Sequence, residues 1–335
     1  MLAAVTGPTG LVGANLVRML LERGMRVRAL TYGDTRALDG LDIECVACDV
    51  LDSEAVQRGV SGADVVYHVA AAITMADRPD PSAERVNEVG TRNVAQACLD
   101  EGVGRLVHFS TVDALSPYPA SSPLTEDRPL CTGDNEFPYV RSKARAHLAV
   151  IETAGLGLDA VIVHPSGIIG PHDYVPSAMG RGLIGWHSGR IPAVLGGGYD
   201  FVDVRDVCDG AIAAAEHGRP GEDYILSGRY LTIMDLMQQV SGITGCKAPT
   251  LVIPLWVASL ARPFMWNRKN GSQPALSRHL IHHLKHLHDI SHDKATVELG
   301  YRPRPIEDTV RDTFEWFDEM GMLNARSSAR AASSP

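Results

Sequence analysis

The chain lacks an excess of basic residues. Its 335 residues include 31 Lys and Arg against 40 Asp and Glu, which gives a net charge of −9. A nucleic-acid partner usually requires a basic surface, so this balance argues against one. Cysteine is also sparse, and the six cysteines are scattered, which favours reduced thiols in the cytoplasm over a disulfide framework.

Uninterrupted hydrophobic stretches of membrane-spanning length are absent as well. The apolar run at 251–265 contains Pro254, Arg262 and Pro263, whereas a spanning helix needs about 20 apolar residues. We therefore expect a buried or substrate-lining helix there and no integral membrane segment. No signal peptide is expected, because a strand is already predicted at 2–6. Residues 324–335 are rich in Ser, Ala and Arg, and we expect a disordered tail.

What the chain does contain is an alternation of short apolar strands and helices. Strands are predicted at 2–6, 25–31, 43–48, 65–69, 105–110 and 160–163, with helices at 11–23, 86–101 and 139–153. This order predicts an α/β fold with a Rossmann-type, doubly wound parallel sheet. We expect this domain to cover 1–170, with a return segment near 200–217. A smaller, mainly helical substrate-binding part should cover 171–199 and 218–323.

A glycine-rich segment follows the first predicted strand. It reads Thr6-Gly7-Pro8-Thr9-Gly10-Leu11-Val12-Gly13 and opens a predicted helix. Gly7 permits a tight turn, Gly10 lets the backbone approach a diphosphate, and Gly13 lets the helix pack on the strand. The helix N-terminus offers N–H groups to phosphate, so this segment predicts a dinucleotide site.

The end of the second predicted strand should contact the adenosine ribose. The sequence there is Thr31-Tyr32-Gly33-Asp34-Thr35-Arg36, with no acid directly at the strand end. An acid would bind the ribose hydroxyls of NAD, whereas an arginine would bind the 2′-phosphate of NADP. We expect Tyr32 and Arg36 to contact the cofactor and NADP to be preferred, with NAD as the alternative through Asp34.

A tyrosine and a lysine lie four residues apart on a predicted helix. Tyr139 and Lys143 would share one helical face, where the lysine and an oxidised nicotinamide would both favour the phenolate. Thr111, helped by Ser110, would position a substrate oxygen. A dinucleotide site combined with such a proton-transfer pair indicates hydride chemistry between a secondary alcohol and a ketone.

These segments together resemble the extended short-chain dehydrogenase/reductase family over about residues 1–320. The dihydroflavonol-reductase and 3β-hydroxysteroid-dehydrogenase branch is the most similar. The motifs that carry the resemblance are the glycine loop, Asp49-Val50, His68-Val69-Ala70-Ala71, Asn87-Glu88-Val89-Gly90-Thr91, Ser110-Thr111, Tyr139-xxx-Lys143, His164-Pro165-Ser166-Gly167, Phe201–Val207 and Leu299-Gly300-Tyr301-Arg302-Pro303. Two positions depart from the family: Thr111 replaces a serine, and His164 stands where arginine is frequent.

The resemblance implies an apolar small-molecule substrate and several further cofactor contacts. Asp49 would contact the adenine, Ala70 and Ala71 would border the cofactor, and Lys143 would also hold the nicotinamide ribose. The remaining cofactor residues implied are Val50, Val69, His164, Pro165 and Gly167. Two alternatives remain open, a nucleotide-sugar epimerase or dehydratase and a non-catalytic dinucleotide sensor.

Three further patterns lead to structural expectations. One predicted helix is crowded with histidines, namely His279, His282, His283, His286 and His288. No carboxylate or cysteine lies nearby, so we expect a partly solvated basic face and no metal.

Asp203 and Asp206 bracket Arg205 and should form ion pairs between the two parts. Helices 86–101 and 139–153 should form a homodimer interface, with close approach at Ala95, Ala97, Ala144, Ala146 and Ala149.

Overall fold

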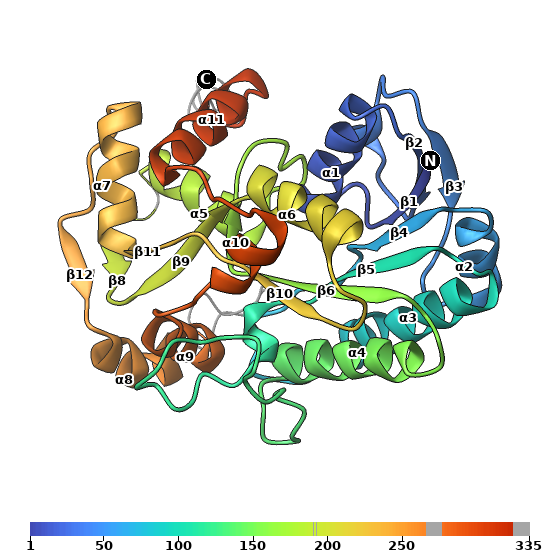
Figure 1. Cartoon of the computed structure of the whole chain (residues 1–335). Helices are drawn as coiled ribbons and strands as arrows, with labels where there is room; N and C mark the ends of the chain where they lie inside the picture. The colour runs from blue at the N-terminus through green and yellow to red at the C-terminus, as the bar shows by residue number, and fades with distance from the viewer. Residues whose placement is uncertain (190, 192, 266–276, 324–335) are drawn as a thin grey trace.

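A seven-stranded parallel sheet forms the centre of the computed structural model, which describes residues 1–189, 191, 193–265 and 277–323 (Figure 1). The strand order is β10-β6-β5-β4-β1-β2-β3, and every pairing is parallel. The strands are β1 (Leu2–Thr6), β2 (Arg26–Thr31), β3 (Glu44–Ala47), β4 (Val65–His68), β5 (Arg105–Phe109), β6 (Ala160–Pro165) and β10 (Asp223–Leu226). The predicted fold class is confirmed.

Helices cover both faces of this sheet (Figure 1). One face packs against α1 (Leu11–Glu22) and α6 (Val204–His217), and the other against α2 (Ser53–Val60), α3 (Pro81–Asp100) and α4 (Pro138–Ala154). Strand residues therefore alternate between two cores: Val5 packs in the first and Ala4 in the second. Burial on both faces explains why the strands read as continuous apolar runs.

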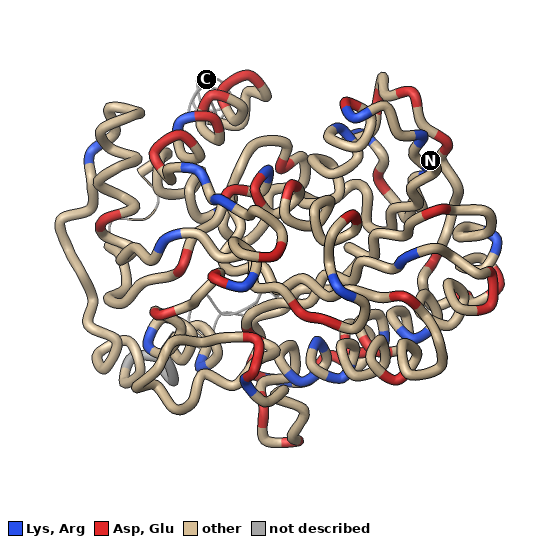
Figure 2. The backbone as a smooth tube through the Cα atoms, viewed as in Figure 1, with Lys and Arg blue, Asp and Glu red and all other residues tan. Residues whose placement is uncertain are grey.

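Helix α3 begins five residues before the predicted position 86. The Asp80 side chain accepts hydrogen bonds from the Ser82 and Ala83 amides, and Pro81 occupies the first turn. Both features are typical of helix starts, so the true start was already indicated by the sequence. The alanines predicted to form a dimer interface are buried within the chain, so that expectation is wrong for Ala95, Ala97, Ala144, Ala146 and Ala149. Charges of both signs are interspersed along α3 and α4 (Figure 2).

The second part of the chain contains two small sheets that the sequence did not reveal. Its strands are β7 (Gly167–Ile169), β8 (Ala193–Leu195), β9 (Gly198–Asp203), β11 (Arg229–Thr232) and β12 (Leu251–Ile253), in the orders β11-β9-β7 and β12-β8. Helices still dominate it: α5 (Ala178–His187), α7 (Ile233–Thr244), α8 (Leu255–Met265), α9 (Arg278–His286), α10 (Asp293–Leu299) and α11 (Ile306–Glu319).

The two parts interlock along the sequence. Strand β10 lies within 218–323 yet forms one edge of the main sheet. In the return segment, β9 pairs within the small sheet, and α6 packs on the main one, with Val202 of β9 in the same core. The predicted tail at 324–335 lies outside the described residues.

The apolar run at 251–265 forms β12 and α8, and the expectation of a buried helix is wrong for two of its large side chains, whereas the substrate-lining alternative stays a prediction. Trp256 is 68% exposed and Leu260 is 67% exposed. Within the described ranges, no helix combines the length and apolar character needed to cross a bilayer.

Candidate active site

The three glycines of the loop after β1 differ in how much space surrounds them. Gly7 has φ +63°, and a Cβ there would lie 2.8 Å from the backbone of Ala70. A Cβ on Gly13 would lie 2.1 Å from the Gly7 carbonyl oxygen, so no side chain fits. Gly10 is different, because its Cβ would meet nothing closer than 3.8 Å. Gly10 therefore faces open space beside the start of α1.

That open space suits a diphosphate. Gly10 is the N-cap of α1, and no side chain caps this helix end or places an acid in its first turn. Thr9, Leu11 and Val12 are partly exposed around it. The amides of an uncapped helix N-terminus bind anionic groups, so the residues present fit the predicted dinucleotide.

The Thr6 side chain serves the framework of the site. Its hydroxyl contacts His68 Nδ1 at 2.8 Å and accepts hydrogen bonds from the Val69 and Ala70 amides, both at 3.1 Å. These bonds fix the segment after β4, including Ala71, beside the Gly7 turn. Thr6 therefore positions the cofactor edge of the sheet through the neighbouring backbone.

The residues predicted to contact the adenosine ribose lie on an exposed loop after β2. Tyr32 is 76% exposed, and Arg36 forms an ion pair with Asp34 at 2.6 Å. The cation expected for NADP and the acid expected for NAD are thus partners of each other. Asp49 follows β3, where its Oδ1 accepts a hydrogen bond from the Leu51 amide at 2.9 Å, and the adjacent Val50 is buried.

Tyr139 and Lys143 lie in the first two turns of α4 and are both buried. Lys143 Nζ donates a 2.6 Å hydrogen bond to the carbonyl oxygen of Phe109, at the end of β5. The Thr111 side chain lies beside the Tyr139 phenol, where it acts to lower the pKa of the phenol. Ser110 Oγ is buried without a protein partner, which leaves it available to a bound group. The structure therefore brings the four predicted catalytic residues together.

Burial controls the electrostatics of this pair. It raises the pKa of Tyr139, with a further contribution from Asp113, and the Thr111 side chain lowers it in part. Burial also lowers the pKa of Lys143 from 10.5 to about 8. Burial is the largest influence on the pKa of the phenol, so the lowering of that pKa by Lys143 and the oxidised nicotinamide stays a prediction for the enzyme with cofactor bound.

The side chain of His164 does not face the cofactor edge. It is fully buried, with Nδ1 3.0 Å from the Thr111 carbonyl oxygen and Nε2 3.2 Å from Asp223 Oδ2. Its imidazole thus supports the backbone of Thr111. Pro165 ends β6, and a Cβ on Gly167 would lie 2.8 Å from the Asp200 carbonyl oxygen, so Gly167 allows β7 to approach β9 closely.

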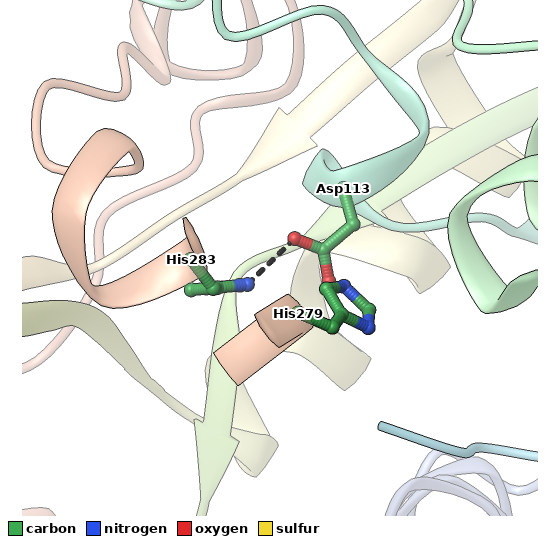
Figure 3. Close-up of side chains that lie close together, drawn as sticks. All are labelled: Asp113, His279 and His283. Carbon is green, nitrogen blue, oxygen red and sulfur yellow. Dashed lines mark ion pairs between the residues drawn. The ribbon is translucent and has the colours of Figure 1, made fainter. Parts of the chain in front are cut away.

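A polar cluster beside Tyr139 was missed by the sequence analysis (Figure 3). Asp113 lies just after β5, and His283 Nδ1 approaches its Oδ1 to 2.8 Å. His279 lies one turn before His283 on α9, and both histidines are buried. The expected solvated face without a carboxylate is therefore wrong at these two positions. Burial alone would raise the pKa of Asp113, but the charge of His283 holds it below its usual value.

The predicted ion pairs between the two parts are confirmed. Arg205 contacts Asp203 at 2.7 Å and Asp312 of α11 at 2.6 Å. Arg304 contacts Asp206 at 2.7 Å. These contacts join the N-terminus of α6 to Arg304 and to Asp312 of α11.

Comparisons with known proteins show the family of this chain. Residues 3–227 match the NAD dependent epimerase/dehydratase family. The chain belongs to this family. Its motifs and relatives place it in the extended short-chain dehydrogenase/reductase branch, so it is an enzyme that uses a nicotinamide dinucleotide.

Similar proteins span almost the whole chain. Sterol demethylase protein B of Methylococcus capsulatus is 35% identical over 96% of this chain and 100% of its own length. A putative dihydroflavonol 4-reductase of Synechocystis is 31% identical over 96% of each chain. The crystal structure of gox2253 is 34% identical, with a TM-score of 0.84 over 96% of this chain and 99% of its own.

Proposed function

We propose that this enzyme interconverts a secondary alcohol and a ketone on an apolar small molecule, with NADP as cofactor and NAD as the alternative. The observation that carries the proposal is the contact between Thr111 and the buried Tyr139 phenol, one helical turn from Lys143. We also propose that it acts as a cytoplasmic homodimer. Two relatives named for a sterol and a dihydroflavonol support a polycyclic or aromatic substrate.

The residues can move a proton in the direction of reduction. When bound, the reduced cofactor supplies the hydride that adds to the carbonyl carbon. Tyr139 donates its phenolic proton to the carbonyl oxygen, and the raised pKa keeps that proton in place at neutral pH. Thr111, helped by Ser110, donates a hydrogen bond to the same oxygen. The buried Lys143 ammonium stabilises the phenolate that remains.

The decisive experiment replaces Tyr139 with phenylalanine. NADPH oxidation is followed with a panel of polycyclic and aromatic ketones, and we expect Tyr139→Phe to lower kcat by about 10³-fold while NADPH binding is kept. Tyr301→Phe is the matched control, because Tyr301 is also a buried phenol but donates to the Ser227 carbonyl oxygen. Unchanged kcat in Tyr139→Phe would refute the assignment.

The two alternative functions are tested by different measurements. Copurified NAD together with tight UDP-sugar binding would favour a nucleotide-sugar epimerase or dehydratase. Turnover with any carbonyl compound would exclude a non-catalytic sensor.

A further inference from the structure

Asp113, His279 and His283 form a compact group of potential metal ligands (Figure 3). Each offers one ligand atom, and these atoms all lie within 4.8 Å of one another. Their residues are less than a tenth exposed. Two imidazoles and one carboxylate are the donors that zinc accepts in sites with an open coordination position.

The hydrogen bonds of the group are incomplete. His279 Nδ1 is buried and has no hydrogen-bond partner in the protein. His283 Nδ1 lies 2.8 Å from Asp113 Oδ1, but the two groups are not aligned as a hydrogen bond. Buried polar atoms are normally satisfied, so these two nitrogens indicate that a further group belongs between them.

Aromatic rings hold both imidazoles in place. His279 stacks on Phe137 with ring centroids 4.7 Å apart, and His283 stacks on Tyr199 at 3.7 Å. Such packing restrains each ring without occupying its nitrogens, and restrained ligands bind a metal with less loss of conformational freedom.

A second group of the same composition differs in one contact to the backbone. His147, His164 and Asp223 also lie close enough to share an ion, and His147 Nδ1 and Asp223 Oδ1 likewise lack a partner. There, however, His164 Nδ1 contacts the Thr111 carbonyl oxygen, and its Nε2 contacts Asp223. Because the backbone holds one imidazole of this group, we take the first group as the metal site.

We propose that Asp113, His279 and His283 bind a Zn²⁺ ion between the segment after β5 and α9, beside Tyr139. Zinc bonds of about 2.0–2.2 Å place tetrahedral ligand atoms roughly 3.4 Å apart. The ligand atoms lie within 4.8 Å of one another, so they approach by at most about 1.4 Å on binding. The ring of His279 lies 6.3 Å from that of Tyr139. The open position would then accept a second oxygen of the substrate, a consequence that also rests on the proposed function.

Metal binding is measured directly on the full-length protein after treatment with a chelator. Zn²⁺ is titrated by calorimetry, and Co²⁺ is titrated as a spectroscopic probe of coordination. We expect one ion per chain, and a loss of affinity of at least about 100-fold in Asp113→Asn, His279→Gln and His283→Gln. The double variant His282→Gln/His286→Gln is the matched control, because these residues share the same helix and spacing.

The outcomes separate this site from the proposed catalysis. Tyr139→Phe should bind Zn²⁺ like the wild type while losing turnover. No binding by the wild type, undiminished binding by Asp113→Asn, or loss of binding in the control variant would each overturn the zinc site. If Asp113→Asn does not fold, His279→Gln and the wild-type Co²⁺ spectrum decide the question, because each tests the ligand set independently.

Discussion

The cofactor edge and the substrate side of Tyr139 are assembled in different ways. At the cofactor edge, Gly7 and Gly13 lie six residues apart and contact each other within one strand-loop-helix unit. On the substrate side, Asp113 meets His279, which lies 166 positions later in the chain. The first arrangement follows from local backbone geometry, whereas the second depends on how the whole second part packs. Substitutions can test how far this contrast extends.

After Tyr139→Phe, the largest effect is expected at Lys143. Lys143→Met should lower kcat by at least about 10²-fold, because the phenolate loses its cation. The same change should stabilise the protein without cofactor at pH 7. Burial lowers the pKa of Lys143 from 10.5 to about 8, so the folded state binds this proton less tightly than the unfolded chain.

The sign of the stability change depends on pH. The buried ammonium costs about 3 kcal/mol of folding free energy below pH 8, and this cost disappears as the pH rises toward 10.5. Thermal unfolding of Lys143→Met should therefore show a gain at pH 7 that shrinks by pH 10. The exposed Lys285→Met serves as control and should show no such trend. A destabilised Lys143→Met at pH 7 would contradict the argument.

The two hydroxyls at the end of β5 should differ in importance. Thr111→Val should lower kcat by about 10²-fold, because it removes the hydroxyl that lies beside Tyr139 and donates to the substrate oxygen. Ser110→Ala should lower it by about tenfold. Steady-state kinetics with one ketone would measure kcat for both variants. A larger loss of kcat in Ser110→Ala would show that Ser110 positions the substrate oxygen and Thr111 assists.

A smaller effect is expected at the exposed loop that selects the cofactor. Arg36→Ala should raise KM for NADPH about tenfold, about 1.4 kcal/mol, and leave KM for NADH nearly unchanged. Asp34→Ala should lower KM for NADPH, because it releases Arg36 from its ion pair. A wild-type enzyme that prefers NADH would reject the assignment of NADP.

The smallest effect on turnover is expected at the outer surface of α3 and α4. Val89, Leu148 and Ile151 are 40%, 38% and 38% exposed, and we expect them to form the homodimer interface in place of the buried alanines. Leu148→Arg should give a monomeric mass by light scattering while kcat per chain changes by less than about twofold. A monomeric wild type at micromolar concentration would exclude the homodimer.

Local pattern predicted the sheet and the Tyr139–Lys143 pair, because strand alternation and helical spacing are properties of short segments. The start of α3 was also present in the sequence, as Asp80 followed by Pro81. The partners of Asp113, in contrast, could not be predicted from the sequence. No spacing rule connects a residue after β5 with histidines on α9. Apolar periodicity marks the buried face of a helix, but the buried face of α9 carries His279 and His283, so the pattern did not indicate it.

The ion pairs at the start of α6 have a mechanical consequence. Arg205 forms ion pairs with Asp203 and with Asp312 of α11, and Arg304 forms one with Asp206. Residues 203–206, where the chain passes between the two parts, are therefore held by ion pairs to Arg304 and Asp312. Charged side chains held this way resist bending at residues 203–206. Domain closure by a hinge at residues 203–206 would therefore have to break both sets of contacts.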